Sequence, residues 1–225
     1  MIRLAAAFTL LAAPALAEPV GIDAERMSVT VETPDGPVEI MRGQDNDAVI
    51  TGDFTRTSRA CPPFCIQPMT PAEGVNTIGE LELLEMLENP EAVVIDSRTR
   101  DWFEGGTIPG AVHMPWDRIT DRLGELGCEP DFEGWDCSDA PEVALFCNGP
   151  WCGQSPTAIR AMIGAGYPAE KINYYRGGMQ IWRLLGLTVR SPFVRPWDES
   201  RTESHRLGPL EVVDVGGRHQ YLSGF

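Results

Sequence analysis

Short apolar runs alternate with amphipathic segments along the middle of this 225-residue chain, and this alternation constrains the fold more than any other feature. Each apolar run has the length of a buried strand. The runs are AVVIDSR (92–98), GAVHMP (110–115), EVALF (142–146) and INYYRGG (172–178). Helical patterns surround them at 77–90, 100–106, 116–126, 155–167 and 179–187. Strands that alternate with helices predict an α/β fold, with a doubly wound parallel sheet covered on both faces.

Patterns of a different kind flank this central region. Residues 27–42 alternate apolar and polar side chains around Pro34-Asp35-Gly36, which predicts a β-hairpin. A similar pattern around Gly216-Gly217 predicts a second hairpin near the C-terminus. At the first predicted helix, Thr77 followed by Glu80 has the pattern of an N-cap. We therefore expect three parts after the leader: an N-terminal extension (18–76), a central domain (77–190) and a C-terminal extension (191–225).

Residues 1–17 have the pattern of a secretory signal peptide. Arg3 precedes an apolar run, and Ala15-Leu16-Ala17 forms a small-x-small cleavage site. The run is shorter than the roughly 20 residues of a membrane span, although an uncleaved anchor is the alternative. We expect a periplasmic or secreted protein without a membrane span in its mature form. The formal net charge of −15 argues against a nucleic-acid partner, because phosphates would be repelled.

The six cysteines form three pairs of near neighbours in the sequence. Disulfides persist in an oxidising compartment, so we expect two structural disulfides, Cys61 with Cys65 and Cys128 with Cys137. A redox or metal pair is the alternative for CPPFC (61–65). A closed zinc site needs four ligands, and the three histidines lie far apart in the sequence, so we expect no metal. We expect no cofactor either, because the chain has no dinucleotide fingerprint or Walker loop.

The third pair lies in ALFCNGPWCGQSP (144–156), where a predicted strand runs directly into Cys147 and a glycine-rich turn leads to a helix. Free amides and the dipole at a helix N-terminus stabilise a thiolate, and they lower a cysteine pKa from about 8.5. The same amides can hold an anion or a persulfide. Cys147 is thus a candidate nucleophile, and a buried inert cysteine is the alternative. The expected anion cradle consists of Asn148, Gly149, Pro150, Trp151, Gly153, Gln154 and Ser155.

Three segments in order resemble the rhodanese-like sulfurtransferase domain: VVIDSRTRDWFEGGTIPGAVHMPW, ALFCNGPWCGQSPTAIRAMIGAGY and YYRGGMQIW. The resemblance covers about residues 77–189. It implies a five-stranded parallel sheet and a six-residue active loop. It also implies that Cys147 accepts a sulfane sulfur and passes it to a thiol or to cyanide.

The chain departs from this family at four positions. Thr107 replaces a frequent histidine, Asn148 replaces a basic residue, and Pro150 removes an amide donor from the loop. These three changes weaken the case for the dianion thiosulfate, unless Arg160 and Arg176 supply charge. The fourth change places Cys152 in the sixth loop position. It could resolve a persulfide on Cys147 or protect Cys147 from oxidation, and a disulfide partner without a catalytic role is the alternative.

The resemblance, together with the loop around Cys147, thus implies a sulfurtransferase or persulfide carrier whose partners are a small sulfur donor or acceptor, or a protein thiol. A dithiol–disulfide exchange protein that uses Cys147 and Cys152 is a second hypothesis. A non-catalytic rhodanese-like binding module is a third. Related phosphatases have a seven-residue loop that ends in arginine, so we do not expect phosphoryl transfer here.

Overall fold

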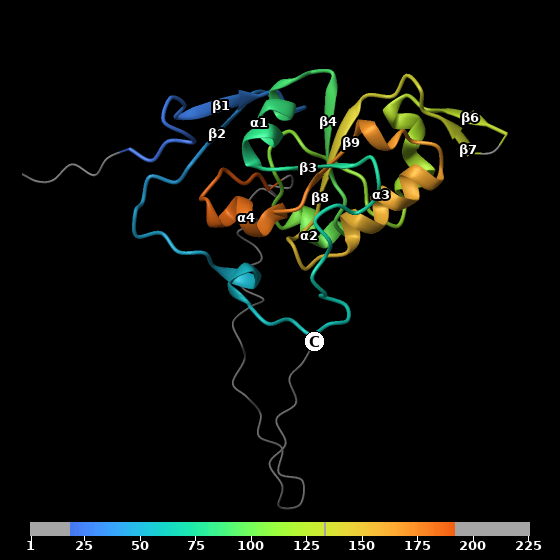
Figure 1. Cartoon of the computed structure of the whole chain (residues 1–225). Coiled ribbons are helices and arrows are strands. Elements are labelled where there is room, and N and C mark those ends of the chain that lie inside the picture. Colours follow the sequence, from blue (N-terminus) through green and yellow to red (C-terminus); the bar gives the residue numbers. More distant parts are fainter. Residues whose placement is uncertain (1–18, 133, 192–225) are drawn as a thin grey trace, which may run out of the picture. The chain divides into compact units, whose positions relative to one another are not determined.

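The central feature of the fold is a five-stranded parallel sheet, seen in a computed structural model that describes residues 19–132 and 134–191. The predicted signal peptide and C-terminal hairpin lie outside the described residues. Every neighbouring pair of strands in the sheet is parallel, which confirms the predicted architecture (Figure 1). The spatial order is β3 (Asn76–Ile78), β9 (Ile172–Tyr175), β8 (Glu142–Phe146), β4 (Ala92–Asp96) and β5 (Val112–His113).

The edge strand β3 replaces the helix start that the sequence predicts. Thr77 lies inside β3, opposite Tyr174 of β9, so its backbone is extended and it is not the N-cap. Helix α1 (Glu80–Glu88) begins after Gly79. The Glu82 carboxylate accepts a hydrogen bond from the Gly79 amide at 2.9 Å, which satisfies a free donor at this helix end.

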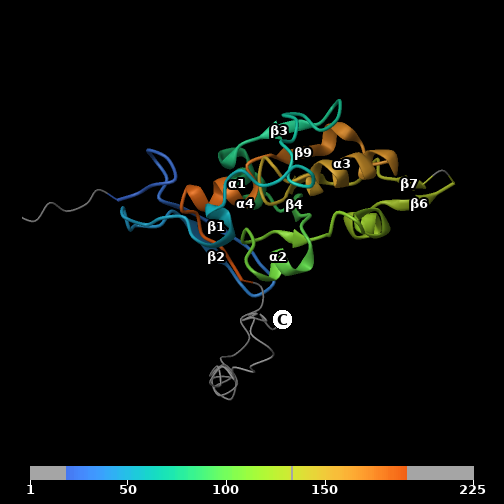
Figure 2. The ribbon, with the colours of Figure 1, turned by 90° about the horizontal axis from the view of Figure 1, so that it is seen from below.

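Side chains along the central strands alternate between two cores, as the pleat requires. Leu145 packs on one face with α3 (Gln154–Gly164) and the 3-10 helix η2 (Ile119–Leu126). Phe146 packs on the other face with α1 and α4 (Gly178–Leu184). Both faces are therefore covered, as predicted (Figures 1 and 2). The pattern at 116–126 produces the 3-10 helix η2 rather than an α-helix. Two further short helices are α2 (Arg100–Glu104) and η3 (Ala169–Lys171).

The N-terminal hairpin adds to the core that contains α1 and α4. Strands β1 (Ser28–Val31) and β2 (Val38–Met41) pair antiparallel, which confirms the prediction. Ile40 is buried in this core. The Gly43 amide donates to the Gly186 carbonyl at 2.7 Å, so the hairpin is joined to the end of α4.

Two smaller features complete the described chain. The 3-10 helix η1 (Gly52–Thr55) lies between β2 and β3. Strands β6 (Glu129–Asp131) and β7 (Gly134–Asp136) pair antiparallel between Cys128 and Cys137. Among residues 19–132 and 134–191, no helix combines the length and apolar character that a membrane crossing needs.

Candidate active site

The loop that contains Cys147 joins a central strand to a helix N-terminus. Cys147 directly follows β8, and α3 begins at Gln154 with Gly153 as its N-cap residue. This places the loop at the carboxyl ends of the strands, where parallel sheets bind ligands.

The first turn of α4 fixes the backbone of this loop. The Met179 amide donates to the Cys147 carbonyl at 3.0 Å, and the Gln180 amide donates to the Asn148 carbonyl at 2.9 Å. Such a close approach requires glycine at position 178, where φ is +54°. A Cβ on Gly178 would lie 2.3 Å from the Cys147 carbonyl oxygen.

The Cys147 sulfur is buried but surrounded by hydrogen-bond donors. The residue is 2% exposed, its thiol is free, and Sγ lies 3.1 Å from the Cys152 carbonyl oxygen, which accepts from the neutral thiol. Burial raises the pKa of Cys147. Hydrogen bonds from the Cys152 thiol, the Ser155 hydroxyl, the Ser155 amide and the Gly149 amide outweigh burial and lower this pKa to about 7. A substantial fraction of Cys147 is therefore thiolate near neutral pH.

Cys152 has the opposite character. Its hydrogen bond to Cys147 raises its pKa, and burial raises it further, so the Cys152 thiol stays protonated. The residue is 5% exposed and free, and its Sγ lies 3.5 Å from Oε1 of Gln154. Two neighbouring thiols thus divide into a thiolate and a proton donor, a separation typical of reactive sites.

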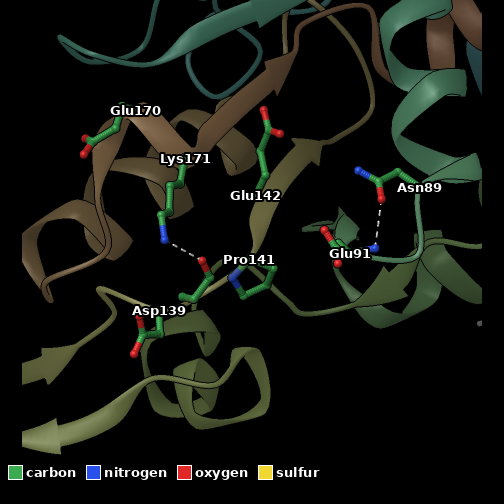
Figure 3. Close-up of a pocket in the computed structure, with 8 residues that line it drawn as sticks. Asn89, Glu91, Asp139, Pro141, Glu142, Glu170 and Lys171 are labelled. Atoms are coloured by element: carbon green, nitrogen blue, oxygen red, sulfur yellow. Dashed lines mark hydrogen bonds between the residues drawn. The ribbon is translucent and has the colours of Figure 1, made fainter.

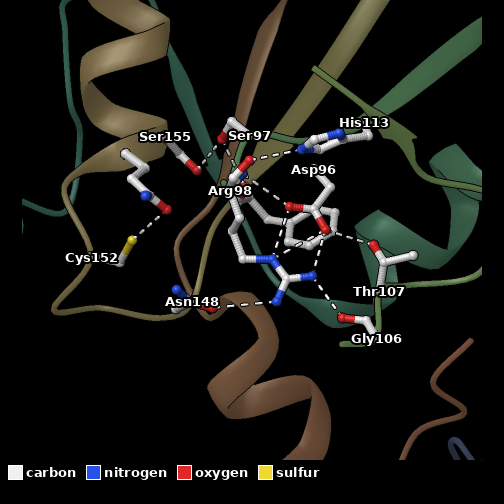
Figure 4. Close-up of polar contacts among 11 residues, drawn as sticks. Asp96, Ser97, Arg98, Gly106, Thr107, His113, Asn148, Cys152 and Ser155 are labelled. Carbon is white, nitrogen blue, oxygen red and sulfur yellow. Dashed lines mark hydrogen bonds and ion pairs between the residues drawn. The ribbon is translucent and has the colours of Figure 1, made fainter. Parts of the chain in front are cut away.

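A buried ion pair contacts the loop through the side chain of Asn148 (Figure 4). Arg98 is fully buried, and its guanidinium forms bidentate hydrogen bonds with Asp96, the shortest at 2.6 Å. The same group donates to the Asn148 side-chain oxygen at 3.3 Å. Thr107, the residue in place of the family's histidine, donates to Asp96 at 2.7 Å. Asp96 and Arg98 therefore anchor the loop. Sequence reasoning did not single out these two residues as part of the site.

A pair of serines joins β4 to α3. The hydroxyl oxygens of Ser97 and Ser155 are 2.8 Å apart, and the Ser97 hydroxyl also donates to the Phe146 carbonyl at 2.8 Å (Figure 4). Sequence reasoning missed Ser97. Ser97 directly follows a predicted strand and precedes Arg98, and this position could have indicated that it belongs to the site. The pair orients Ser155, whose hydroxyl and amide both face Cys147.

The two arginines that could have supplied charge to the loop donate to other groups. Arg160 contacts the Pro71 carbonyl and the Thr157 hydroxyl, both at 3.5 Å. Arg176 donates to the Gln67 carbonyl at 3.0 Å. The donors around the Cys147 sulfur are therefore amides, a hydroxyl and a thiol rather than guanidinium groups.

The other four cysteines form disulfides in the structure, Cys61 with Cys65 and Cys128 with Cys137. The described residues contain no group of three or more histidine, cysteine or acidic side chains that could hold a metal ion.

A large surface pocket of about 660 Å³ lies at the amino ends of the strands, opposite the end that carries Cys147 (Figure 3). Glu142 is the first residue of β8, and Glu91 directly precedes β4, so the pocket is at the amino ends of the strands. Lys171 donates there to the Ser138 and Ala140 carbonyls. The pocket is therefore separate from the loop of Cys147.

Comparison with known proteins assigns the central region. The family model described as the rhodanese-like domain matches residues 80–185. Residues 80–185 are a rhodanese-like domain. An HTH-type transcriptional regulator of Mycobacterium tuberculosis is 32% identical over 114 residues. That match covers 51% of this chain but only 44% of the regulator, so the chain spans less than half the length of this curated relative.

Several solved structures also match part of the chain. A rhodanese-related protein of Thermoplasma volcanium is 21% identical, with a TM-score of 0.39 over 52% of this chain and 98% of that chain. A thiosulfate sulfurtransferase of Pseudomonas aeruginosa is 23% identical, with a TM-score of 0.39 over 52% of this chain and 20% of that chain.

Proposed function

We propose that the rhodanese-like domain is a sulfurtransferase in which Cys147 carries sulfane sulfur to a thiol or to cyanide. One observation carries the proposal: a buried thiol whose pKa is lowered to about 7 by donors from a helix N-terminus, a glycine turn and a second cysteine. Membership of residues 80–185 in a family that includes sulfurtransferases supports it. Amides that favour a thiolate also favour the anionic persulfide that sulfur transfer requires.

The transfer occurs in two displacement steps. The Cys147 thiolate attacks the sulfane sulfur of the donor, an S–S bond forms, and the rest of the donor leaves with the electron pair of the broken bond. An acceptor thiolate or cyanide then attacks the outer sulfur. The electron pair of the S–S bond returns to Cys147, which is again a thiolate.

Cys152 offers a second way to complete the reaction. The outer sulfur of the Cys147 persulfide takes the proton of Cys152, the Cys152 thiolate attacks the inner sulfur, a Cys147–Cys152 disulfide forms, and hydrosulfide leaves. An external dithiol then reduces this disulfide and restores both thiols. The presence of two free thiols five residues apart in one loop favours this role.

We place this activity in the periplasm or outside the cell. The leader-like residues 1–17 and the two disulfides support this location, because such bonds persist in oxidising compartments. Sequencing the N-terminus of the protein recovered from a periplasmic fraction tests it, and an intact leader on cytoplasmic protein would overturn it.

Intact-mass measurement tests the sulfur transfer. The reduced protein is mixed with inorganic polysulfide, desalted and weighed, and a gain of one sulfur atom is expected. Subsequent cyanide should remove this sulfur as thiocyanate. The gain should be absent in Cys147→Ser, and a gain that persists in this variant overturns the assignment.

Dithiol–disulfide exchange is the second candidate function, favoured by the two free thiols of the loop. It predicts reversible Cys147–Cys152 oxidation without any sulfur transfer. Cys152→Ser separates the two functions. Sulfur loading on Cys147 should persist in this variant if the domain is a sulfurtransferase, whereas all redox activity should be lost if it is an exchange protein.

A further inference from the structure

The segment between the N-terminal hairpin and β3 lies over the active loop. We name residues 54–67 the strap. At one end, the Phe54 carbonyl accepts a hydrogen bond from the Gln180 side chain, in the turn of α4 that holds the loop. At the other end, the Gln67 amide donates to the Pro150 carbonyl at 2.8 Å. The strap is thus attached both to the loop and to the helix that fixes it.

Trp151 of the loop is the main contact between these attachments. The Arg59 guanidinium lies 4.4 Å from the centre of the Trp151 ring, and the Phe64 ring packs edge-on against it at 5.4 Å. Cation–π and edge-to-face contacts are both favourable arrangements for an indole. The disulfide between Cys61 and Cys65 closes the short turn that presents Phe64.

The strap lies against the loop that surrounds the buried reactive sulfur. Cys147 and Cys152 are only 2% and 5% exposed, although the first must meet a donor and an acceptor. The Gln67 side chain lies against Gly153, where an added Cβ would be 3.5 Å from Nε2 of Gln67. The strap therefore contacts positions 150, 151 and 153 of the loop.

A pocket of about 520 Å³ lies between the strap and Trp151. This size suits a small molecule. Its lining combines apolar side chains, Phe64, Ile66 and Trp151, with the guanidinium groups of Arg56 and Arg59. Arg56 is 3.6 Å from Asp53, whereas no carboxylate in the described part of the chain pairs with Arg59. In a chain with a net charge of −15, this local positive charge favours an anion.

We propose that the strap makes the sulfur-transfer site selective: it admits small anionic sulfur donors, which the pocket beside Trp151 collects, and it keeps bulky reagents away from Cys147. The inference rests on the proposed function of Cys147 as the sulfur carrier. Inorganic polysulfides are donors of the favoured class, and peptide persulfides such as that of glutathione belong to the excluded class.

Alkylation by reagents of different size tests access without any sulfur chemistry. Cys147 is treated with N-ethylmaleimide or with a maleimide that carries a polyethylene glycol chain, and labelling is followed by peptide mass spectrometry. Trp151→Ala and the double variant Cys61→Ser/Cys65→Ser should react with the large reagent about tenfold faster than the wild type, since each loses strap contacts or strap shape. In the double variant, which leaves the loop sequence intact, the rate with the small reagent should change less than about threefold, which is within the effect of one weak contact.

A matched control removes an exposed aromatic residue outside the strap. Phe132→Ala, in the β6–β7 turn, should leave both rates unchanged. Circular dichroism checks that each variant is folded. The proposal is overturned if the large reagent labels wild-type Cys147 as fast as the small one, or if the strap variants accelerate both reagents equally.

Sulfur donors then test selectivity. Persulfide loading of Cys147 should be faster with inorganic polysulfide than with glutathione persulfide, and Trp151→Ala should reduce this difference. Arg59→Gln should raise the half-saturating polysulfide concentration by about threefold or more, because one cation of the pocket is lost. If both donors load wild-type Cys147 at the same rate, the proposed selectivity is overturned, whereas the proposed sulfur-transfer function is not. If neither donor loads Cys147, the proposed function fails, and the alkylation rates still decide whether the strap controls access.

Discussion

Arg98 donates a hydrogen bond to the side chain of Asn148 at 3.3 Å, so the fully buried ion pair with Asp96 is in direct contact with the loop of the nucleophile. The two residues lie 50 positions apart in the sequence. A buried charge network at this place couples the stability of the domain to the shape of its reactive loop.

Removing Arg98 should therefore be costly. Arg98→Met leaves the Asp96 carboxylate buried without its partner, and we expect a loss of about 3 kcal/mol or more in the free energy of unfolding, measured by urea denaturation. Arg118→Met is the control, because Arg118 pairs with Asp121 on the surface and should lose less than about 1 kcal/mol. Equal losses in the two variants would contradict the role assigned to the buried pair.

Replacing Cys152 should change the pKa of Cys147 in a way that depends on the substituent. Cys152→Ala removes a donor that faces the Cys147 sulfur, so the pKa should rise above its value of about 7. Cys152→Ser keeps a donor and should keep the pKa near that of the wild type. The pH dependence of the iodoacetamide reaction at Cys147 measures both values. The same pKa in the alanine and serine variants would show that the Cys152 thiol does not stabilise the thiolate.

The stability of the domain should rise between pH 6 and pH 8. The Cys147 pKa is about 7 in the folded protein and about 8.5 in an unfolded chain, so the unfolded chain binds more protons in this window. The contribution is lost as the pH falls through 7, and we expect a gain of about 1 kcal/mol from pH 6 to pH 8. Above about pH 8.5 the raised pKa of Cys152 acts in the opposite direction. Urea denaturation across this range measures the gain, which should be missing from Cys147→Ser. A gain of equal size in that variant would assign it to other groups.

Gly178→Ala should distort the active loop. The new Cβ would lie 2.3 Å from the Cys147 carbonyl oxygen and 2.8 Å from the Gly149 amide, and φ is positive at this position. We expect a lower melting temperature and a slower reaction of Cys147 with iodoacetamide. Gly164→Ala in α3 is the control, because its Cβ would meet no atom within 4 Å and should stabilise the helix by up to about 1 kcal/mol. A Gly178→Ala protein that behaves like this control would show that the close approach is not needed.

The sheet could be predicted because its strands follow simple rules. Leu145 and Phe146 face opposite cores, so the EVALF run is apolar at successive positions, as a strand buried on both faces must be. The edge strand β3 could not be predicted, because it is three residues long and its pairing with β9 depends on residues far along the chain. That tertiary pairing overrides the local capping pattern at Thr77.

The reactive loop could be predicted in part. A cysteine between a strand and a helix indicates a thiolate site from local geometry alone, and Cys147 lies at such a position. The residues that hold the loop in place lie far from it in the sequence. Arg98 donates a hydrogen bond to Asn148, and Phe64 packs against Trp151. No local pattern in CPPFC predicts that its phenylalanine packs on a tryptophan of the active loop.

The strap belongs to a stretch of chain that is held at both ends. On the N-terminal side of the strap, the Gly43 amide donates a hydrogen bond to the Gly186 carbonyl. On its C-terminal side, β3 begins at Asn76 and pairs with β9. A segment tethered in this way can bulge outward but cannot leave as a free arm. Any opening of the strap is therefore a unimolecular event, whose rate does not depend on protein concentration and which can reverse without a second molecule.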